Sequence, residues 1–100
     1  MLILPRNPGQ SVRISTNGIG HIWATMLRHG VDITFQGGNF HLEQITPSPT
    51  EMLGGWDITD ESGTIVIIRR LAPMYPDRTP RIGINAPKDY AILREELIHD

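Results

Sequence analysis

The 100-residue chain has no cysteine, so neither a disulfide bond nor a cysteine-ligated zinc ion can stabilise it. It also lacks a hydrophobic run of membrane-spanning length. The opening Met1–Leu4 run stops at Pro5, far short of a membrane span or the apolar core of a signal peptide. No nucleophile motif, phosphate-binding loop or dinucleotide fingerprint is present. We therefore expect a soluble cytoplasmic protein that is not an enzyme and needs no cofactor.

A basic surplus is missing as well, since the net charge is −2 at pH 7. This value argues against nucleic acid, whose binding proteins usually carry excess positive charge. The charge is unevenly distributed, however: residues 1–15 carry +2, residues 16–63 carry −5 and residues 64–100 carry +1. The acidity belongs to the middle of the chain, and the two end segments are together basic.

The four histidines do not form a metal-binding pattern. His21 and His29 are eight residues apart, too far along a helix to share one metal ion, and His41 and Glu43 could present two ligands on one strand face. No third or fourth ligand follows at a diagnostic spacing, so we expect no metal. The two tryptophans, Trp23 and Trp56, either pack in a core or provide a stacking platform for a base.

Both ends of the chain have strand patterns. Residues 1–6 read as a short apolar strand whose Pro5 belongs on a sheet edge, and a turn at residues 7–10 leads into a second strand at residues 11–15. Residues 82–84 alternate, residues 85–88 form a corner, and Tyr90, Ile92 and Arg94 share one side of a last strand. Residues 95–98 suit the first turn of a short helix that must dock on the rest.

The middle of the chain has a helical pattern followed by two hairpin patterns. The helix is predicted for residues 18–29, with Gly30 as its left-handed cap. Its apolar residues at helical spacing are Ile19, Ile22, Trp23, Met26 and Leu27. Hairpins are predicted for residues 31–42, turning at residues 37–39, and for residues 56–71, turning at residues 60–63. The two hairpins align at an offset of 25 residues. Shared hairpin chemistry explains this better than a true repeat does.

The two ends also carry a family resemblance. Residues 81–89, Arg-Ile-Gly-Ile-Asn-Ala-Pro-Lys-Asp, followed by Ile92 and by Arg-Glu-Glu-Leu at residues 94–97, closely resemble the C-terminal half of the carbon storage regulator family (CsrA/RsmA). Residues 1–14 resemble that family's first strand and the turn into its second, and residues 64–71 fit its third strand. The resemblance implies a mainly β protein: an interleaved β-sandwich homodimer with a short C-terminal helix. The single domain, residues 1–100, would hold an insertion at about residues 16–62 that contains the helix and a hairpin.

The resemblance implies that the protein is a sequence-specific RNA-binding regulator of translation. It would recognise GGA motifs in single-stranded or hairpin-loop regions of mRNA leaders or small RNAs. In the family, the first strand of one chain lies beside the fifth strand of the other, and RNA binds along that paired edge. The residues carried over by match are Leu4, Arg6, Ala86, Pro87, Lys88, Ile92 and Arg94. Without the family match, Arg94 would read as a surface arginine paired with Glu95 or Glu96.

Two departures from the family pattern predict weaker RNA binding or an altered target. Asn7 stands where the family usually has a second arginine, and Pro5 has no amide hydrogen. The acidic middle favours an alternative: an interaction protein whose insertion docks a protein partner or forms mixed dimers with other family members. A metal-dependent enzyme built on the histidines is the weakest hypothesis.

Overall fold

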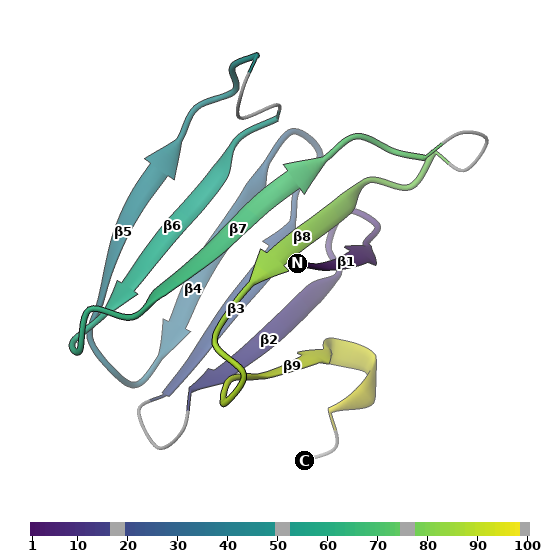
Figure 1. Cartoon of the computed structure of the whole chain (residues 1–100). Coiled ribbons are helices and arrows are strands. Elements are labelled where there is room, and N and C mark those ends of the chain that lie inside the picture. Colours follow the sequence, from purple (N-terminus) through teal and green to yellow (C-terminus); the bar gives the residue numbers. More distant parts are fainter. Residues whose placement is uncertain (17–19, 50–52, 75–77, 99–100) are drawn as a thin grey trace.

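The chain forms two antiparallel β-sheets that pack face to face (Figure 1). The computed structural model describes residues 1–16, 20–49, 53–74 and 78–98. In chain order the strands are β1 (Leu2–Pro5), β2 (Ser11–Thr16), β3 (Gly20–Met26), β4 (Val31–Gln36), β5 (Phe40–Ile45), β6 (Gly55–Asp60), β7 (Ile65–Leu71), β8 (Arg81–Asn85) and β9 (Ala91–Arg94). One sheet has the order β1-β8-β7-β6-β5 and the other β4-β3-β2-β9. The prediction of a mainly β fold is confirmed.

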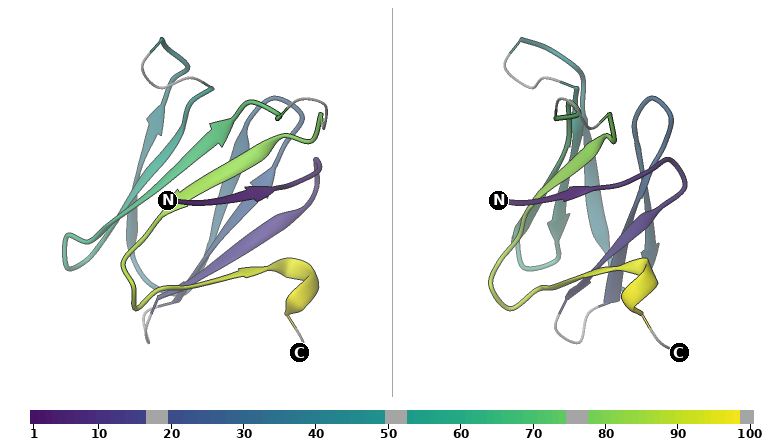
Figure 2. Two further views of the ribbon diagram at one scale, coloured as in Figure 1. Left: turned by 45° about the vertical axis from the view of Figure 1, so that its right-hand side comes forward. Right: turned by 90° about the vertical axis from the view of Figure 1, so that its right-hand side faces the viewer.

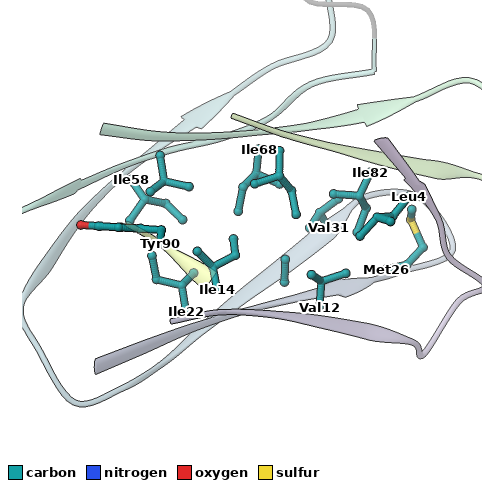
Figure 3. Packing of buried hydrophobic residues seen from close by; sticks show 13 residues of the cluster. Leu4, Val12, Ile14, Ile22, Met26, Val31, Ile58, Ile68, Ile82 and Tyr90 are labelled. Atoms are coloured by element: carbon teal, nitrogen blue, oxygen red, sulfur yellow. The ribbon is translucent and has the colours of Figure 1, made fainter. Parts of the chain in front are cut away.

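The core lies between the two sheets and is built mainly from isoleucine and valine (Figure 3). Side chains alternate along each strand, so every second residue points inward. Ile14 and Ile22 from one sheet face Ile58 and Ile68 from the other, and all four are 0% exposed. Because both sheets bury their apolar faces in the same layer, neither can stay folded without the other.

The strands predicted at the two ends of the chain are present as β1, β2, β8 and β9, and Pro5 lies on an edge strand as expected. The hairpin predicted for residues 56–71 is also present, because β6 pairs with β7. Asp60 stabilises its turn: Oδ1 accepts hydrogen bonds from the backbone N–H groups of Ser62 and Thr64, both at 2.9 Å. Gly63 completes the turn with a φ of +87°, which glycine adopts without strain.

The helix predicted for residues 18–29 is wrong where the structure describes it, because residues 20–26 form strand β3; residues 17–19 lie outside the described part. Ile22 and Met26 fit a strand period as well as a helical one, and Ala24 between them also points inward. Pairing with β2 decides between the two periods, since tertiary contacts override a weak local preference. Gly30 belongs to the β3–β4 turn, where the Leu27 N–H donates to its carbonyl, and it does not have the predicted left-handed φ.

The hairpin predicted for residues 31–42 is also wrong. Its two strands exist, but β4 pairs with β3 while β5 pairs with β6 in the other sheet. Gly37 and Gly38 have φ angles of 76° and 74°, and with them the chain crosses from one sheet to the other. The rings of Phe35 and Phe40 stack across this crossing with centroids 4.8 Å apart. The supposed insertion is therefore divided between both sheets and forms part of the common core.

The strands β2–β5 are repeated in space by β6–β9. Ile14 pairs with Ile22 in the β2–β3 hairpin, and Ile58 pairs with Val66 in the β6–β7 hairpin, so these two hairpins are equivalent at an offset of 44 residues. The offset of 25 in the sequence compared residues 31–42 with residues 56–71, which are not equivalent in the strand order. In each unit the fourth strand is exchanged: β9 pairs with β2, and β5 pairs with β6. β1 stands outside the repeat and pairs with β8. No strand of the described chain takes the equivalent position beside β4.

The C-terminal helix predicted after residue 94 is a single 3₁₀ turn, Glu95–Leu97, in the described residues. It docks as expected, because Glu95 Oε1 accepts a hydrogen bond from the backbone N–H of Ser11 at 3.0 Å. Within the described ranges no helix is long and apolar enough to cross a membrane.

Candidate nucleic-acid interface

The first and last strands lie on the same side of the sandwich, in different sheets (Figure 2). Each is the end strand of its sheet, β1 in one and β9 in the other. We call this edge the β1/β9 seam, formed by residues 2–6 and 91–94. The equivalent edge on the opposite side is the β4/β5 seam, formed by residues 31–36 and 40–45. The resemblance implies a first strand paired with the last strand of a second chain; within this chain the two strands end different sheets, with β1 paired to β8 and β9 paired to β2.

Cross-strand pairing fixes the direction of the side chains at the β1/β9 seam, because directly opposite residues share a face of the sheet. Ile92 lies opposite Ile14, and Arg94 lies opposite Val12. Since Ile14 and Val12 are buried between the sheets, Ile92 and Arg94 also lie on the side that faces β1. Leu4 points inward from β1 and is buried. Three of the predicted RNA-binding residues therefore converge on one seam.

Arg6 is a fourth predicted residue, and its guanidinium holds the two ends of the chain together. Nη1 and Nη2 donate to Oε2 and Oε1 of Glu96 at 2.9 and 2.8 Å, and Nε donates to the Pro5 carbonyl at 2.7 Å. These hydrogen bonds from Arg6 lower the pKa of Glu96 to about 2, and the pairing raises the pKa of Arg6. Arg6 is only 5% exposed. It is a clamp between β1 and the turn after β9, with little surface available to a ligand.

Arg94 is exposed and has a different environment. The sequence left open a pairing with Glu95 or Glu96, but Glu95 accepts from the Ser11 N–H and Glu96 from Arg6. Arg94 lies near enough for its charge to contribute to the lowered pKa of Glu96. In the part of the chain that the structure describes, its guanidinium has no hydrogen-bond or ion-pair partner. It is therefore available to an anion or a base at the rim of the seam.

The corner before β9 carries the remaining predicted residues. Ala86 and Pro87 are half-buried, Lys88 is exposed, and the Tyr90 N–H donates to the Pro87 carbonyl at 3.0 Å to close the turn. The Tyr90 hydroxyl donates to Asp60 Oδ2 at 2.5 Å, which fixes the corner against the β6–β7 turn. Burial, together with this bond, raises the pKa of Tyr90 to about 12. A cation therefore lies near each end of β9: Lys88 in the corner before it and Arg94 at its last residue.

The β4/β5 seam has a different composition. Gln44 lies opposite Trp56 as Arg94 lies opposite Val12, so glutamine takes the place of the free arginine. The Trp56 indole N–H donates to the Val31 carbonyl of the end strand β4 at 2.7 Å. Strands β4 and β5 contain two acidic residues and no Lys or Arg. This difference was not predicted, since little sequence identity accompanies the repeat.

The remaining candidate residues lie elsewhere. Among the described residues no three His, Cys, Asp or Glu side chains are grouped to hold a metal ion, and His21 shares a hydrogen bond with the Ser15 hydroxyl at 2.8 Å. Trp56 packs against the core, as one of the two alternatives predicts. Trp23 lies on the outer face of its sheet with the Arg13 guanidinium 5.9 Å from its ring centroid.

The fold and this seam define an antiparallel β-sandwich with an internal repeat of four strands and one cationic edge. Comparison of the chain with protein-family models, curated proteins and solved structures found no match. The chemistry of the seam itself must therefore carry any assignment of function.

Proposed function

We propose that the β1/β9 seam binds single-stranded RNA containing a GGA motif and that the protein is a post-transcriptional regulator. The proposal joins two supports of different kinds. The residues at the two ends of the chain resemble the carbon storage regulator family, in which RNA binds along the paired edge of one chain's first strand and the other chain's fifth strand. The second support is that β1 and β9, which match those strands, end their two sheets on the same side of the sandwich.

The observation that carries the proposal is the position of Arg94. Its guanidinium lies at the rim of the seam, on the side facing β1, while both neighbouring carboxylates are engaged elsewhere. An unpaired guanidinium can hold a phosphate by two parallel hydrogen bonds or stack on a base. Arg6 then acts by positioning, because its bond to Glu96 holds the turn that follows Arg94.

Backbone groups can supply the recognition of bases. As end strands, β1 and β9 each have one edge without a neighbouring strand in the described chain. Unpaired N–H and C=O groups match the donors and acceptors on the exposed edges of guanine and adenine, as a side chain would. Pro5 has no backbone N–H and so removes one of these donors. RNA binding is therefore weaker than at an edge with all of its N–H groups.

The seam is complete in one copy of the chain, so we propose a monomer as the active unit in place of the homodimer that the resemblance implies. One copy has one such seam. At the β4/β5 seam, the Trp56 N–H instead donates to the Val31 carbonyl of the end strand β4. The protein would then bind one RNA per chain and could not bridge two motifs. Light scattering of the protein with and without RNA measures this stoichiometry directly.

The test is RNA binding by fluorescence anisotropy, using hairpins that differ only in a GGA or GCA loop, at two salt concentrations. Sequence-specific binding keeps its preference for GGA at the higher salt, where non-specific attraction has fallen. Arg94→Ala should remove most of the binding, whereas Arg13→Ala, which removes the same charge from the outer face, should not. Equal affinity of the wild type and Arg94→Ala for the GGA hairpin would refute the assignment.

One observation favours the interaction protein as a second candidate. Strand β4 ends its sheet and carries the exposed Asp32 on its outer face, so this edge suits a basic partner. Under this alternative the wild type shows no preference for GGA, and native mass spectrometry shows a stoichiometric complex with an ordinary carbon storage regulator. Loss of that complex in Asp32→Lys would support the acidic surface as its cause.

A further inference from the structure

A pocket of about 570 Å³ opens at the end of the sandwich where β1 ends and β8 begins. Its described walls come from strand β7 and from four connections, those between β1 and β2, β3 and β4, β5 and β6, and β7 and β8. Arg28, Arg70 and Arg78 are among the lining residues, and we call this site the arginine pocket. No acidic residue is among the described residues that line it.

Arg70 is the fixed wall of the arginine pocket. Its Nη1 donates to the carbonyls of Gly30 and Leu27 at 2.7 and 2.8 Å, and its Nη2 donates to the Arg28 carbonyl at 3.1 Å. These bonds hold the β3–β4 turn in place and fix the guanidinium. Because carbonyl oxygens are neutral, they orient Arg70 and leave its positive charge uncompensated.

Arg28 and Arg78 provide the exposed part of the pocket's positive charge. Both side chains are exposed, and within the described ranges neither has a hydrogen-bond or ion-pair partner. Three guanidinium groups around one concavity repel each other and concentrate positive potential there. Such an arrangement favours an anion, and guanidinium geometry matches the oxygens of a phosphate in particular.

The arginine pocket adjoins the β1/β9 seam. Asn7 lines the pocket and directly follows Arg6, whose backbone N–H donates to the carbonyl of Pro80, another lining residue, at 2.9 Å. Arg6 in turn is bonded to Glu96, two residues after Arg94. A strand of RNA that leaves the seam past Arg94 therefore meets the pocket next.

We propose that the arginine pocket binds a phosphate group, supplied by the backbone of the RNA strand that flanks the recognised motif. The source of the phosphate rests on the proposed function, whereas the pocket's affinity for phosphate does not. Its volume exceeds that of one phosphate and leaves room for the attached ribose. The pocket adds affinity and selects RNA with a single-stranded flank, but it reads no base.

The first experiment is independent of RNA. Tripolyphosphate is titrated into the isotope-labelled full-length protein, and NMR shifts are followed in the wild type, in Arg28→Ala/Arg78→Ala and in Arg13→Ala. Saturable shifts at the β3–β4 turn and the β7–β8 loop in the wild type and in Arg13→Ala, but absent from the double variant, are expected. Shifts that do not saturate, or that persist in the double variant, would overturn the pocket.

The second experiment tests the source of the phosphate. The same GGA hairpin is used blunt and with a single-stranded tail at either end, and affinity is measured against salt. The double variant should lower the slope of log K against log salt by about 0.7 for one of the tailed RNAs, the contribution of one single-strand phosphate contact. The slope for the blunt hairpin should not change.

The outcomes separate the two proposals. Equal slopes for the double variant and the wild type on both tailed RNAs would reject RNA as the source, even if tripolyphosphate binds. If the wild type binds no RNA at all, the proposed function fails; saturable tripolyphosphate binding that the double variant loses would still support a phosphate pocket, and its absence would reject it.

Discussion

The two seams of the sandwich occupy equivalent positions in the internal repeat, but they differ in almost every residue that could bind a ligand. The β1/β9 seam has a strand on each side, an exposed Arg94 and a clamp between Arg6 and Glu96. At the β4/β5 seam, Gln44 takes the place of the arginine, and the Trp56 N–H donates to the free edge of β4 where the described chain has no strand. The strands beneath the two seams are paired in the same order. A repeated strand order can thus be kept while the side chains at its two edges diverge.

The largest expected effect tests the symmetric part of this comparison. Ile14 and Ile58 are equivalent and fully buried, so Ile14→Ala and Ile58→Ala should each lower the free energy of unfolding by about 3 kcal/mol, measured by denaturant titration. Ile65→Ala, at an exposed position of β7, should cost less than about 0.5 kcal/mol. Costs for the two buried sites that differ by more than about 2 kcal/mol would show that the two halves of the core are not equivalent.

The second prediction tests whether the residue difference between the seams matters, by exchanging Arg94 and Gln44. Arg94→Gln makes the first seam resemble the second, and the affinity for a GGA hairpin should fall about tenfold to a hundredfold, the usual effect of losing one or two charge-assisted hydrogen bonds. Adding Gln44→Arg should not restore binding, because no strand like β1 lies beside β4 in the described chain. Recovery of affinity in the double variant would mean that the first strand is not needed.

The third prediction concerns Trp56, whose N–H is bonded to β4 at the β4/β5 seam. Trp56→Phe keeps an aromatic ring but removes the N–H that donates to Val31, so the free energy of unfolding should fall by about 1 kcal/mol. Trp23→Phe on the outer face is the matched control, since its indole N–H has no acceptor among the described residues. If both variants lose the same stability, the hydrogen bond to β4 is not what distinguishes Trp56.

The strands that could be predicted from the sequence are those whose alternation has no competing period. β1, β2, β8 and β9 are of this kind, and so is the hairpin of β6 and β7, whose turn has both an Asp60 and a Gly63. β3 could not be predicted, because Ile22 and Met26 fit both a helix and a strand. The pairing of β4 with β3 and of β5 with β6 depends on a crossing between sheets that local pattern does not encode.

The candidate site was partly accessible to sequence for the same reason. The exposed Arg94 was singled out by resemblance, and its role stays a prediction. The hydrogen bond between Arg6 and Glu96 joins residues 90 positions apart, so no local sequence pattern predicts it. Asn7 was expected to remove a cation, but the structure brings Arg28 and Arg78 to the pocket that Asn7 lines.

The smallest expected effect at neutral pH concerns the clamp, which only the β1/β9 seam has. The pKa of Glu96 is lowered to about 2 from its ordinary value of 4.5, so its ionised form stabilises the folded state. This contribution is present above about pH 4.5 and is lost as the pH falls towards 2. Glu96→Gln should therefore be less stable than the wild type at pH 7, with a difference that shrinks through this window. Denaturant midpoints measured across it provide the check.

Glu43→Gln is the matched control, because it removes the same charge from the β4/β5 seam, where the exposed Glu43 has no arginine partner in the described residues. Asp60 also has a pKa lowered to about 2 and titrates in the same window. It is unchanged in both variants, so it cancels when each is compared with the wild type. A deficit of Glu96→Gln that stays constant down to pH 2 would assign its cost to lost packing, and the clamp would then not depend on the charge of Glu96.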